Sequence, residues 1–256
     1  VIKAQRGRLR IYENPVRRVM YVAGADCSEG DPGSDPSPLV VLNRMKLSVA
    51  AVLWTRMPPD LLARYAVALS WIYNEATLIW EANNQGITFG QTVQQLEYGN
   101  VYLRRTSEDS VALKNSDKMG YWSGTKTKLN AVNTLRTYIR DAPDKQYPPI
   151  VDPYICHELP SWIFDGDLAL VQDNSRGYEG LMHHGDASYA LAMTLVAHRG
   201  SMDSPLEPIP IDEVRAARDS ILSRFGPGHR ATPDDLMVNG DVTCEDLELF
   251  DEMEQT

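Results

Sequence analysis

Short apolar runs rich in β-branched residues alternate with amphipathic stretches along the chain. Three such runs, residues 19–25, 39–43 and 47–55, follow one another closely and are separated by turn-forming or polar residues. Their spacing predicts three consecutive strands of an antiparallel meander. Similar runs at residues 77–80 and 101–104 predict two further short strands.

Apolar positions recur every three or four residues in the stretches between and after these runs. This spacing predicts helices over residues 61–73, 88–96, 128–138, 187–198 and 212–225. A meander followed by strand-and-helix units is typical of a mixed sheet. We therefore expect an α/β fold in which a mixed β-sheet is flanked by helices on both faces.

The other segments carry weaker patterns. Residues 106–123 are polar and contain Gly, which predicts an exposed loop. Residues 150–151 suggest a short strand, residues 157–164 a short helix and residues 168–178 a β-hairpin. We see no internal repeat.

Composition changes at both ends of the chain and divides it into three parts. Residues 1–18 are basic and polar, and Val at position 1 in place of Met predicts that a longer polypeptide precedes them. We expect this stretch to be an incoming linker. Residues 19–228 then form one domain that ends at a Gly-Pro-Gly break, and residues 229–256 form an acidic tail.

The formal net charge of −10 comes almost entirely from this tail. Residues 231–256 contain nine acids and no Lys or Arg, so 26 acids remain against 25 bases in the rest of the chain. Between residues 101 and 145 nine bases outnumber five acids. This stretch predicts a nucleic-acid-binding face, although solvated faces of ordinary helices and loops would give the same count. The bases assigned to that face are Arg104, Arg105, Lys118, Lys126 and Lys128.

Several classes of protein are excluded by composition. Of the 256 residues 43% are hydrophobic and 23% charged, as in ordinary globular domains. No apolar stretch approaches the roughly 18–20 residues that a membrane-spanning helix needs, so we expect no membrane partner. Three widely spaced Cys residues argue against a disulfide framework and favour a reducing compartment, and no Cys-x-x-Cys pair suggests zinc.

Three acids share positions at which side chains converge in such folds. Asp26 and Glu81 each follow a predicted strand, and Asp186 precedes a predicted helix. Carboxylates brought together repel one another unless a divalent cation neutralises them, and ligation by oxygen alone favours Mg²⁺ or Mn²⁺ over zinc. The alternative is that two of them only begin loops and the third only caps a helix.

Three segments containing these acids resemble one protein family. They are residues 21–30, residues 80–86 with the pattern Glu-x-Asn-Asn-x-Gly, and residues 183–187 followed by Ala190-Leu191-Ala192. In this order they are similar to the carboxyl-terminal nuclease domain of the large terminase subunits of tailed phages. Residues 11–15 and 120–125 also resemble that family, so the likeness covers about residues 10–200. The Glu-x-Asn-Asn-x-Gly element is its most specific piece.

The resemblance implies an RNase H/resolvase-like fold and a metal-dependent DNA endonuclease. Asp26, Glu81 and Asp186 would hold two Mg²⁺ or Mn²⁺ ions and cut the phosphodiester backbone, with no Ser, Cys or Lys nucleophile required. The implied role is to cut concatemeric DNA at the start and end of viral genome packaging. Implied partners are double-stranded DNA, an upstream ATPase domain, the portal and the small terminase subunit. The implied location is the host cytoplasm, transiently on the procapsid.

The sequence departs from the family pattern at one position and leaves two other functions open. The family commonly has two consecutive acids after the His, and Gly185 occupies the first of these positions. Either one metal site is therefore weaker, or it is completed by Glu29, Asp35, His184 or Glu158. A stand-alone Holliday-junction resolvase of the same fold is one alternative. A docking module without catalysis, whose acidic tail binds the portal or small subunit, is the other.

Overall fold

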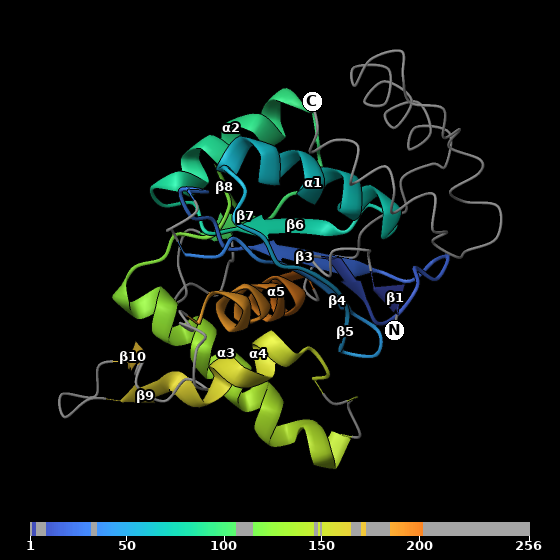
Figure 1. Cartoon of the computed structure of the whole chain (residues 1–256), viewed down its shortest axis with the longest axis vertical. Coiled ribbons are helices and arrows are strands. Elements are labelled where there is room, and N and C mark those ends of the chain that lie inside the picture. Colours follow the sequence, from blue (N-terminus) through green and yellow to red (C-terminus); the bar gives the residue numbers. More distant parts are fainter. Residues whose placement is uncertain are drawn as a thin grey trace.

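A mixed sheet of six strands forms the centre of the computed structural model (Figure 1). The structure describes residues 2–3, 9–31, 35–105, 115–145, 148, 150–164, 170–172 and 185–201. The strands are β1 (Ile2–Lys3), β2 (Leu9–Ile11), β3 (Tyr21–Ala25), β4 (Leu39–Asn43), β5 (Ser48–Leu53) and β6 (Thr77–Trp80), in the order β1-β2-β5-β4-β3-β6. All neighbours are antiparallel except β3 and β6, which run parallel.

Helices cover both faces of this sheet, because the strands are apolar on both sides. On one face lie α1 (Pro59–Ile72) and α2 (Gln85–Gln95), and on the other lie α3 (Thr125–Lys145), α4 (Pro153–Glu158) and α5 (Asp186–Ser201) (Figure 1). Alternate residues of β3 separate the two cores: Tyr21 and Ala23 pack with α1 and α2, whereas Val22 packs with α5. The predicted fold class is thereby confirmed.

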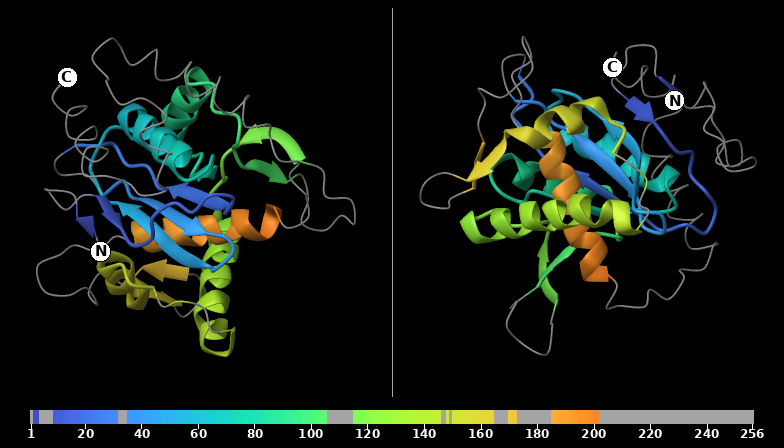
Figure 2. Two further views of the ribbon diagram at one scale, coloured as in Figure 1. Left: turned by 90° about the vertical axis from the view of Figure 1, so that its right-hand side faces the viewer. Right: turned by 90° about the horizontal axis from the view of Figure 1, so that it is seen from below.

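Helix α5 lies directly against the sheet, and α3 crosses its outer side (Figure 2). The close approach of α5 to the sheet depends on Gly24 in β3. A Cβ atom at Gly24 would lie 2.6 Å from Thr194 Cγ2 and 2.8 Å from the carbonyl oxygen of Ala190. The missing side chain therefore lets the backbone of α5 pack on β3, next to the strand end that carries Asp26.

Two small hairpins complete the described structure. Strands β7 (Leu103–Arg105) and β8 (Asn115–Met119) pair with each other, and their flanks join the edge of the sheet through the bridges Leu78–Val101 and Glu81–Tyr121. Strands β9 (Trp162–Phe164) and β10 (Leu170–Gln172) follow the short 3₁₀ helix η1 (Leu159–Ser161).

Several predicted elements agree with the structure, and others need correction. The strands at 39–43 and 77–80 agree to the residue. Residues 115–119, expected in a loop, form β8 because they pair with β7, whereas the expected strand at 150–151 does not form. The expected helix at 157–164 is instead the end of α4, η1 and β9, since Asp152 caps α4 and starts it at Pro153.

The segment expected to be an incoming linker contributes to the sheet. Leu9 and Ile11 of β2 are buried in the core beside β5, and Arg10 forms a buried ion pair of 2.8 Å with Asp152. Tyr12 donates a hydrogen bond to the same carboxylate. Residues 9–12 are therefore part of the domain, because their side chains bind elements 140 residues away in the sequence.

Two other expected segments, the helix at 212–225 and the acidic tail at 229–256, lie outside the described residues. None of the helices in the part of the chain that the structure describes is long and apolar enough to cross a membrane.

Candidate active site

Two of the three predicted acids lie side by side because their strands are parallel neighbours in register. Ala25 of β3 is opposite Trp80 of β6, and the next residues are Asp26 and Glu81. The backbone N–H of Glu81 donates to the carbonyl of Ala25 at 3.1 Å, which continues the pairing into the two acids. Carboxyl ends of adjacent parallel strands are a common place for ligand sites in α/β sheets.

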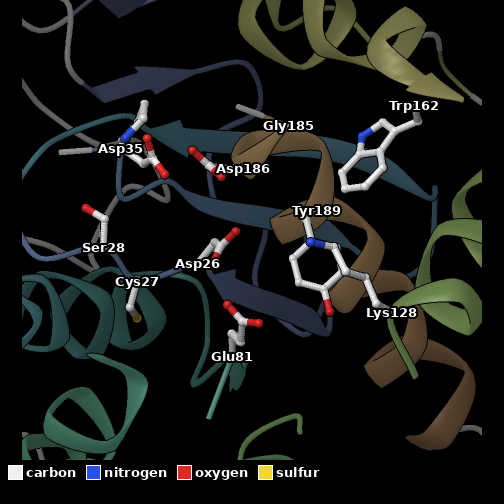
Figure 3. A pocket seen from close by; sticks show the side chains of 11 residues that line it. Asp26, Cys27, Ser28, Asp35, Glu81, Lys128, Trp162, Gly185, Asp186 and Tyr189 are labelled. Atoms are coloured by element: carbon white, nitrogen blue, oxygen red, sulfur yellow. The ribbon is translucent and has the colours of Figure 1, made fainter. Parts of the chain in front are cut away.

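The third acid reaches the same place from a helix. Asp186 is the first residue of α5, and Figure 3 shows Asp26 between Glu81 and Asp186. A pocket of about 180 Å³ lies among them. Its lining residues are Asp26, Cys27, Ser28, Asp35, Pro36, Glu81, Lys128, Trp162, Gly185, Asp186 and Tyr189.

Burial and neighbouring negative charges raise the pKa values of Asp26 and Asp186. Burial, the negative charges of Asp186 and Glu81, and a hydrogen bond with Glu81 hold the pKa of Asp26 well above its usual range. Burial first, and then the charges of Glu158 and Asp35, raise the pKa of Asp186 to about 8. Lys128 opposes both shifts. In the absence of a cation, the site therefore binds protons in place of a metal ion.

The donor set fits a divalent metal ion with oxygen ligands. Asp186 Oδ2 is buried and has no hydrogen-bond partner among the described residues, as expected for an atom left for a ligand. Within the same residues no three His, Cys, Asp or Glu side chains form a ready-made cage for one ion. Mg²⁺ does not need such a cage, because it is usually bound through one or two carboxylates and keeps several waters.

Lys128, which the sequence assigned to a nucleic-acid-binding face, lines the pocket itself. Its Nζ atom is 5.3 Å from the ring centre of Tyr189 and 5.4 Å from that of Trp162 (Figure 3). The two rings therefore hold this cation beside the carboxylates. Trp162 and Tyr189 were not predicted as site residues, because the positions of β9 and α5 relative to the sheet depend on tertiary packing.

Glu158 does not line the pocket. It accepts hydrogen bonds from the first turn of α5, the helix that begins at Asp186. Glu158 is only 2% exposed, and its Oε2 accepts the backbone N–H of Ser188 at 2.7 Å. The backbone of Ala187 also hydrogen-bonds to this carboxyl group. Glu158 thus caps the start of α5 from α4, and it is not the ligand that the sequence considered for the metal site. Burial raises the pKa of Glu158 to about 7. Its role is consequently to position Asp186 rather than to line the pocket.

The remaining predicted residues fall in different places. Glu29 is exposed and does not line the pocket, whereas Asp35 does. Lys118 and Lys126 are exposed, and Arg104 is partly buried. Arg105 belongs to β7. His184 lies outside the described residues.

Metal-free protein should lose stability as the pH rises from about 4 to about 8. Asp186 binds its proton more tightly in the folded chain than its ordinary value of 3.8 implies, so ionisation above that pH favours unfolding. One such group contributes at most about 1.4 kcal/mol per pH unit. Urea unfolding in EDTA at pH 5 and pH 8 should show a smaller loss for Asp186→Asn than for the unchanged chain. Equal losses would contradict the assignment.

Removal of the Glu158 cap should loosen the start of α5. Both Glu158→Gln and Glu158→Ala remove the charge, but Gln keeps one acceptor for the helix N–H groups. We expect the Ala variant to unfold about 1–3 kcal/mol more easily than the Gln variant. Hydrogen exchange at Ala187 and Ser188 should also accelerate more in the Ala variant. Unchanged exchange there, with acceleration only elsewhere in the chain, would show that the cap is not what Glu158 provides.

Comparison with solved structures identifies the fold. The large terminase nuclease from thermophilic phage G20c with bound cobalt matches with a TM-score of 0.57 and 16% identity, over 77% of this chain and 90% of that one. Its magnesium-bound form matches with a TM-score of 0.55 and 18% identity over the same shares of the two chains. The large terminase nuclease domain of Thermus phage P74-26 matches with a TM-score of 0.53 and 15% identity, over 76% and 87%.

These similarities are of structure, since no protein-family model and no curated protein sequence matches the chain. The resemblance seen in the sequence is thus supported by the three-dimensional arrangement, and the chain has the fold of the nuclease domains of phage large terminases.

Proposed function

We propose that this chain is a divalent-metal-dependent DNA endonuclease domain of a viral genome-packaging motor. One observation carries the proposal: Asp26, Glu81 and Asp186 surround one pocket from two parallel strands and a helix. They do so in a fold shared with terminase nucleases, of which one was solved with cobalt, magnesium and zinc. In this role the domain would cut concatemeric DNA at the start and end of packaging.

Asp26, Glu81 and Asp186 would hold two Mg²⁺ or Mn²⁺ ions. Such ions activate a water molecule for attack and stabilise the leaving oxygen of a phosphodiester. Among the residues that the structure describes, Oδ2 of Asp186 is buried without a hydrogen-bond partner, which leaves this oxygen available for a cation. Binding would relieve the repulsion that raises the pKa values of Asp26 and Asp186.

Asp35 supplies a fourth carboxylate where Gly185 has none. Gly185 has a φ of 77°, a conformation that an acidic residue adopts only with strain. In Figure 3 the carboxyl group of Asp35 lies on the same side of the pocket as Asp186, and its charge contributes to the raised pKa of Asp186. We therefore assign Asp35 to the position that the departure at Gly185 leaves open.

Lys128 would bind the phosphate that enters the pocket. The positive charge of its ammonium group acts on the carboxylates, because it lowers the pKa of both Asp26 and Asp186. A phosphodiester approaching four carboxylates is repelled, and a fixed positive charge offsets part of this repulsion. Its contacts with the Tyr189 and Trp162 rings would orient it toward the substrate.

The nucleophilic side chains near the pocket are poorly suited to attack a phosphodiester themselves. Burial and the charges of Asp26 and Glu81 raise the pKa of Cys27 well above its usual range, so it stays a thiol. Ser28 Oγ is hydrogen-bonded to Ser37 Oγ at 2.7 Å, and Ser37 is no general base. Both observations favour water as the nucleophile.

The wider assignments follow from the same proposal. Double-stranded DNA would lie across Arg104, Arg105, Lys118 and Lys126 toward Lys128. An ATPase domain, the portal and the small terminase subunit would be the other partners. The site of action would be the host cytoplasm, transiently on the procapsid.

A plasmid assay tests the proposal. Supercoiled plasmid incubated with the chain should be nicked or linearised with Mg²⁺ or Mn²⁺ and remain intact with EDTA. A docking module without catalysis would leave the plasmid intact in every condition. A preference for four-way junctions over plasmid would instead indicate a Holliday-junction resolvase.

A further inference from the structure

The loop between β8 and α3 presents an aromatic side chain to solvent beside the pocket. Trp122 is 53% exposed. Arg104 lies over its ring, with the guanidinium carbon 5.4 Å from the ring centre, and Arg104 Nε donates to the carbonyl of Gly120 at 3.1 Å. A large apolar ring at the surface has a cost in free energy. Exposed aromatic rings accompanied by basic side chains are what single-strand-binding proteins use to stack on nucleobases.

This loop is held rigidly by the same motif that supplies Glu81. The Asn83 side chain donates from Nδ2 to the carbonyl of Ser123 at 2.6 Å, and its Oδ1 accepts the N–H of Ser123 at 3.0 Å. Thr127 Oγ1 donates to the carbonyl of Trp122 at 2.7 Å and accepts the N–H of Gly124 at 2.7 Å. The backbone of Trp122 is thus fixed on both sides, so its ring needs little ordering upon binding.

A direct contact joins this loop to the pocket. Ser123 Oγ is 2.6 Å from the hydroxyl of Tyr189, which lines the pocket. On the other side of Trp122, Tyr121 forms a β-bridge with Glu81. A strand that reaches the carboxylates from the side of this loop would therefore pass close to Trp122. The exposed Lys118 and Lys126 give the surroundings the charge that a nucleic-acid strand requires.

We propose that Trp122, backed by Arg104, stacks on an unpaired or terminal nucleobase of the DNA strand that enters the pocket. This inference rests on the proposed function, because it takes DNA as the substrate. In an intact duplex each base face is covered by its neighbours, so an indole ring finds a free face only at a nick, a flap or a strand end. The site would thus favour locally opened DNA over continuous duplex.

The test uses DNA with the fluorescent base 2-aminopurine in a short unpaired flap beside a nick, in EDTA to prevent cutting. Binding of the full chain should quench the flap fluorescence, since stacking quenches this base. Trp122→Ala should abolish the quenching and weaken flap binding by about tenfold or more, and Trp122→Phe should restore part of both. Affinity for closed-circular duplex should change little in either variant.

Two matched variants separate stacking from other effects. Lys126→Ala should flatten the salt dependence of binding by about one unit and leave the quenching intact. Met45→Ala removes another exposed apolar side chain, 69% exposed in the turn between β4 and β5, and should change neither.

Two results would overturn the inference. Equal weakening of flap and closed-circular DNA by Trp122→Ala would place the ring on paired backbone, and unchanged quenching in that variant would place the base elsewhere. Absence of DNA binding by the unchanged chain would instead refute the proposed function, and this inference with it.

Discussion

Replacement of Asp186 by Asn should reduce metal-dependent cleavage of plasmid DNA by about a thousandfold or more. This variant replaces one carboxylate oxygen of Asp186 by an amide NH₂ group. In the unchanged chain Oδ2 of Asp186 is buried and has no hydrogen-bond partner among the described residues. Loss of a metal ligand removes several kcal/mol of charge stabilisation at the reacting phosphate, and each 1.4 kcal/mol corresponds to a factor of ten in rate. Rates of plasmid nicking at saturating Mg²⁺ and Mn²⁺ measure the effect.

The loss of activity should not come from unfolding. Burial raises the pKa of Asp186 to about 8, so a neutral Asn should leave the metal-free fold at least as stable as the unchanged chain near pH 8. Titration of Mn²⁺ by calorimetry should show weaker binding. Glu97→Gln, which neutralises an exposed carboxylate just after α2, is the matched control and should cleave normally. Normal cleavage by Asp186→Asn would place the active site elsewhere.

Most of the carboxylate site follows from the sequence, because strand ends are local features. The runs before Asp26 and Glu81 are short, apolar and β-branched, and each ends on an acid. Parallel register between β3 and β6 then brings those two ends together. Asp186 follows a Gly and starts a helix of small residues that fits closely against Gly24. These sequence patterns are short-range, and together with the family resemblance they predicted the three carboxylates that line the pocket.

Lys128 and Glu158 were both named as candidates from the sequence, but where each lies could not be predicted, because their positions depend on tertiary packing. Lys128 is one of nine bases in a basic stretch, and nothing in its immediate neighbours distinguishes it from Lys126. Only the crossing of α3 and α5 places it beside the rings of Tyr189 and Trp162. Glu158 likewise reads as an ordinary helix acid, and it becomes a cap only because α4 ends against the first turn of α5.

The strand at residues 9–11 was missed for a related reason. Leu9, Arg10 and Ile11 show no clear periodicity within a basic stretch. They are buried because Arg10 finds a carboxylate at Asp152, which is fully buried. The burial of Arg10 could not be predicted from its own neighbours, because the carboxylate that binds it is 142 positions away in the sequence.

Gly86→Ala should destabilise the fold by about 3 kcal/mol or more and displace Glu81. A Cβ atom at Gly86 would lie 1.6 Å from the carbonyl oxygen of Glu81 and 2.7 Å from its carbonyl carbon. The turn cannot easily yield, because the carbonyl of Gly86 accepts the indole N–H of Trp80 at 3.0 Å. The last Gly of the Glu-x-Asn-Asn-x-Gly element is therefore required for the turn that presents the carboxylate.

Urea unfolding of Gly86→Ala and Gly99→Ala in EDTA measures this effect. Gly99 is exposed, and a Cβ there would meet no atom within 4 Å, so its Ala variant should be about as stable as the unchanged chain. If Gly86→Ala still folds at low temperature, its Mn²⁺ affinity should fall, because the backbone of Glu81 must shift to admit the new methyl group. Equal stability and equal Mn²⁺ affinity of the two variants would show that the turn relaxes without moving Glu81, and that the glycine in this motif serves neither the fold nor the site.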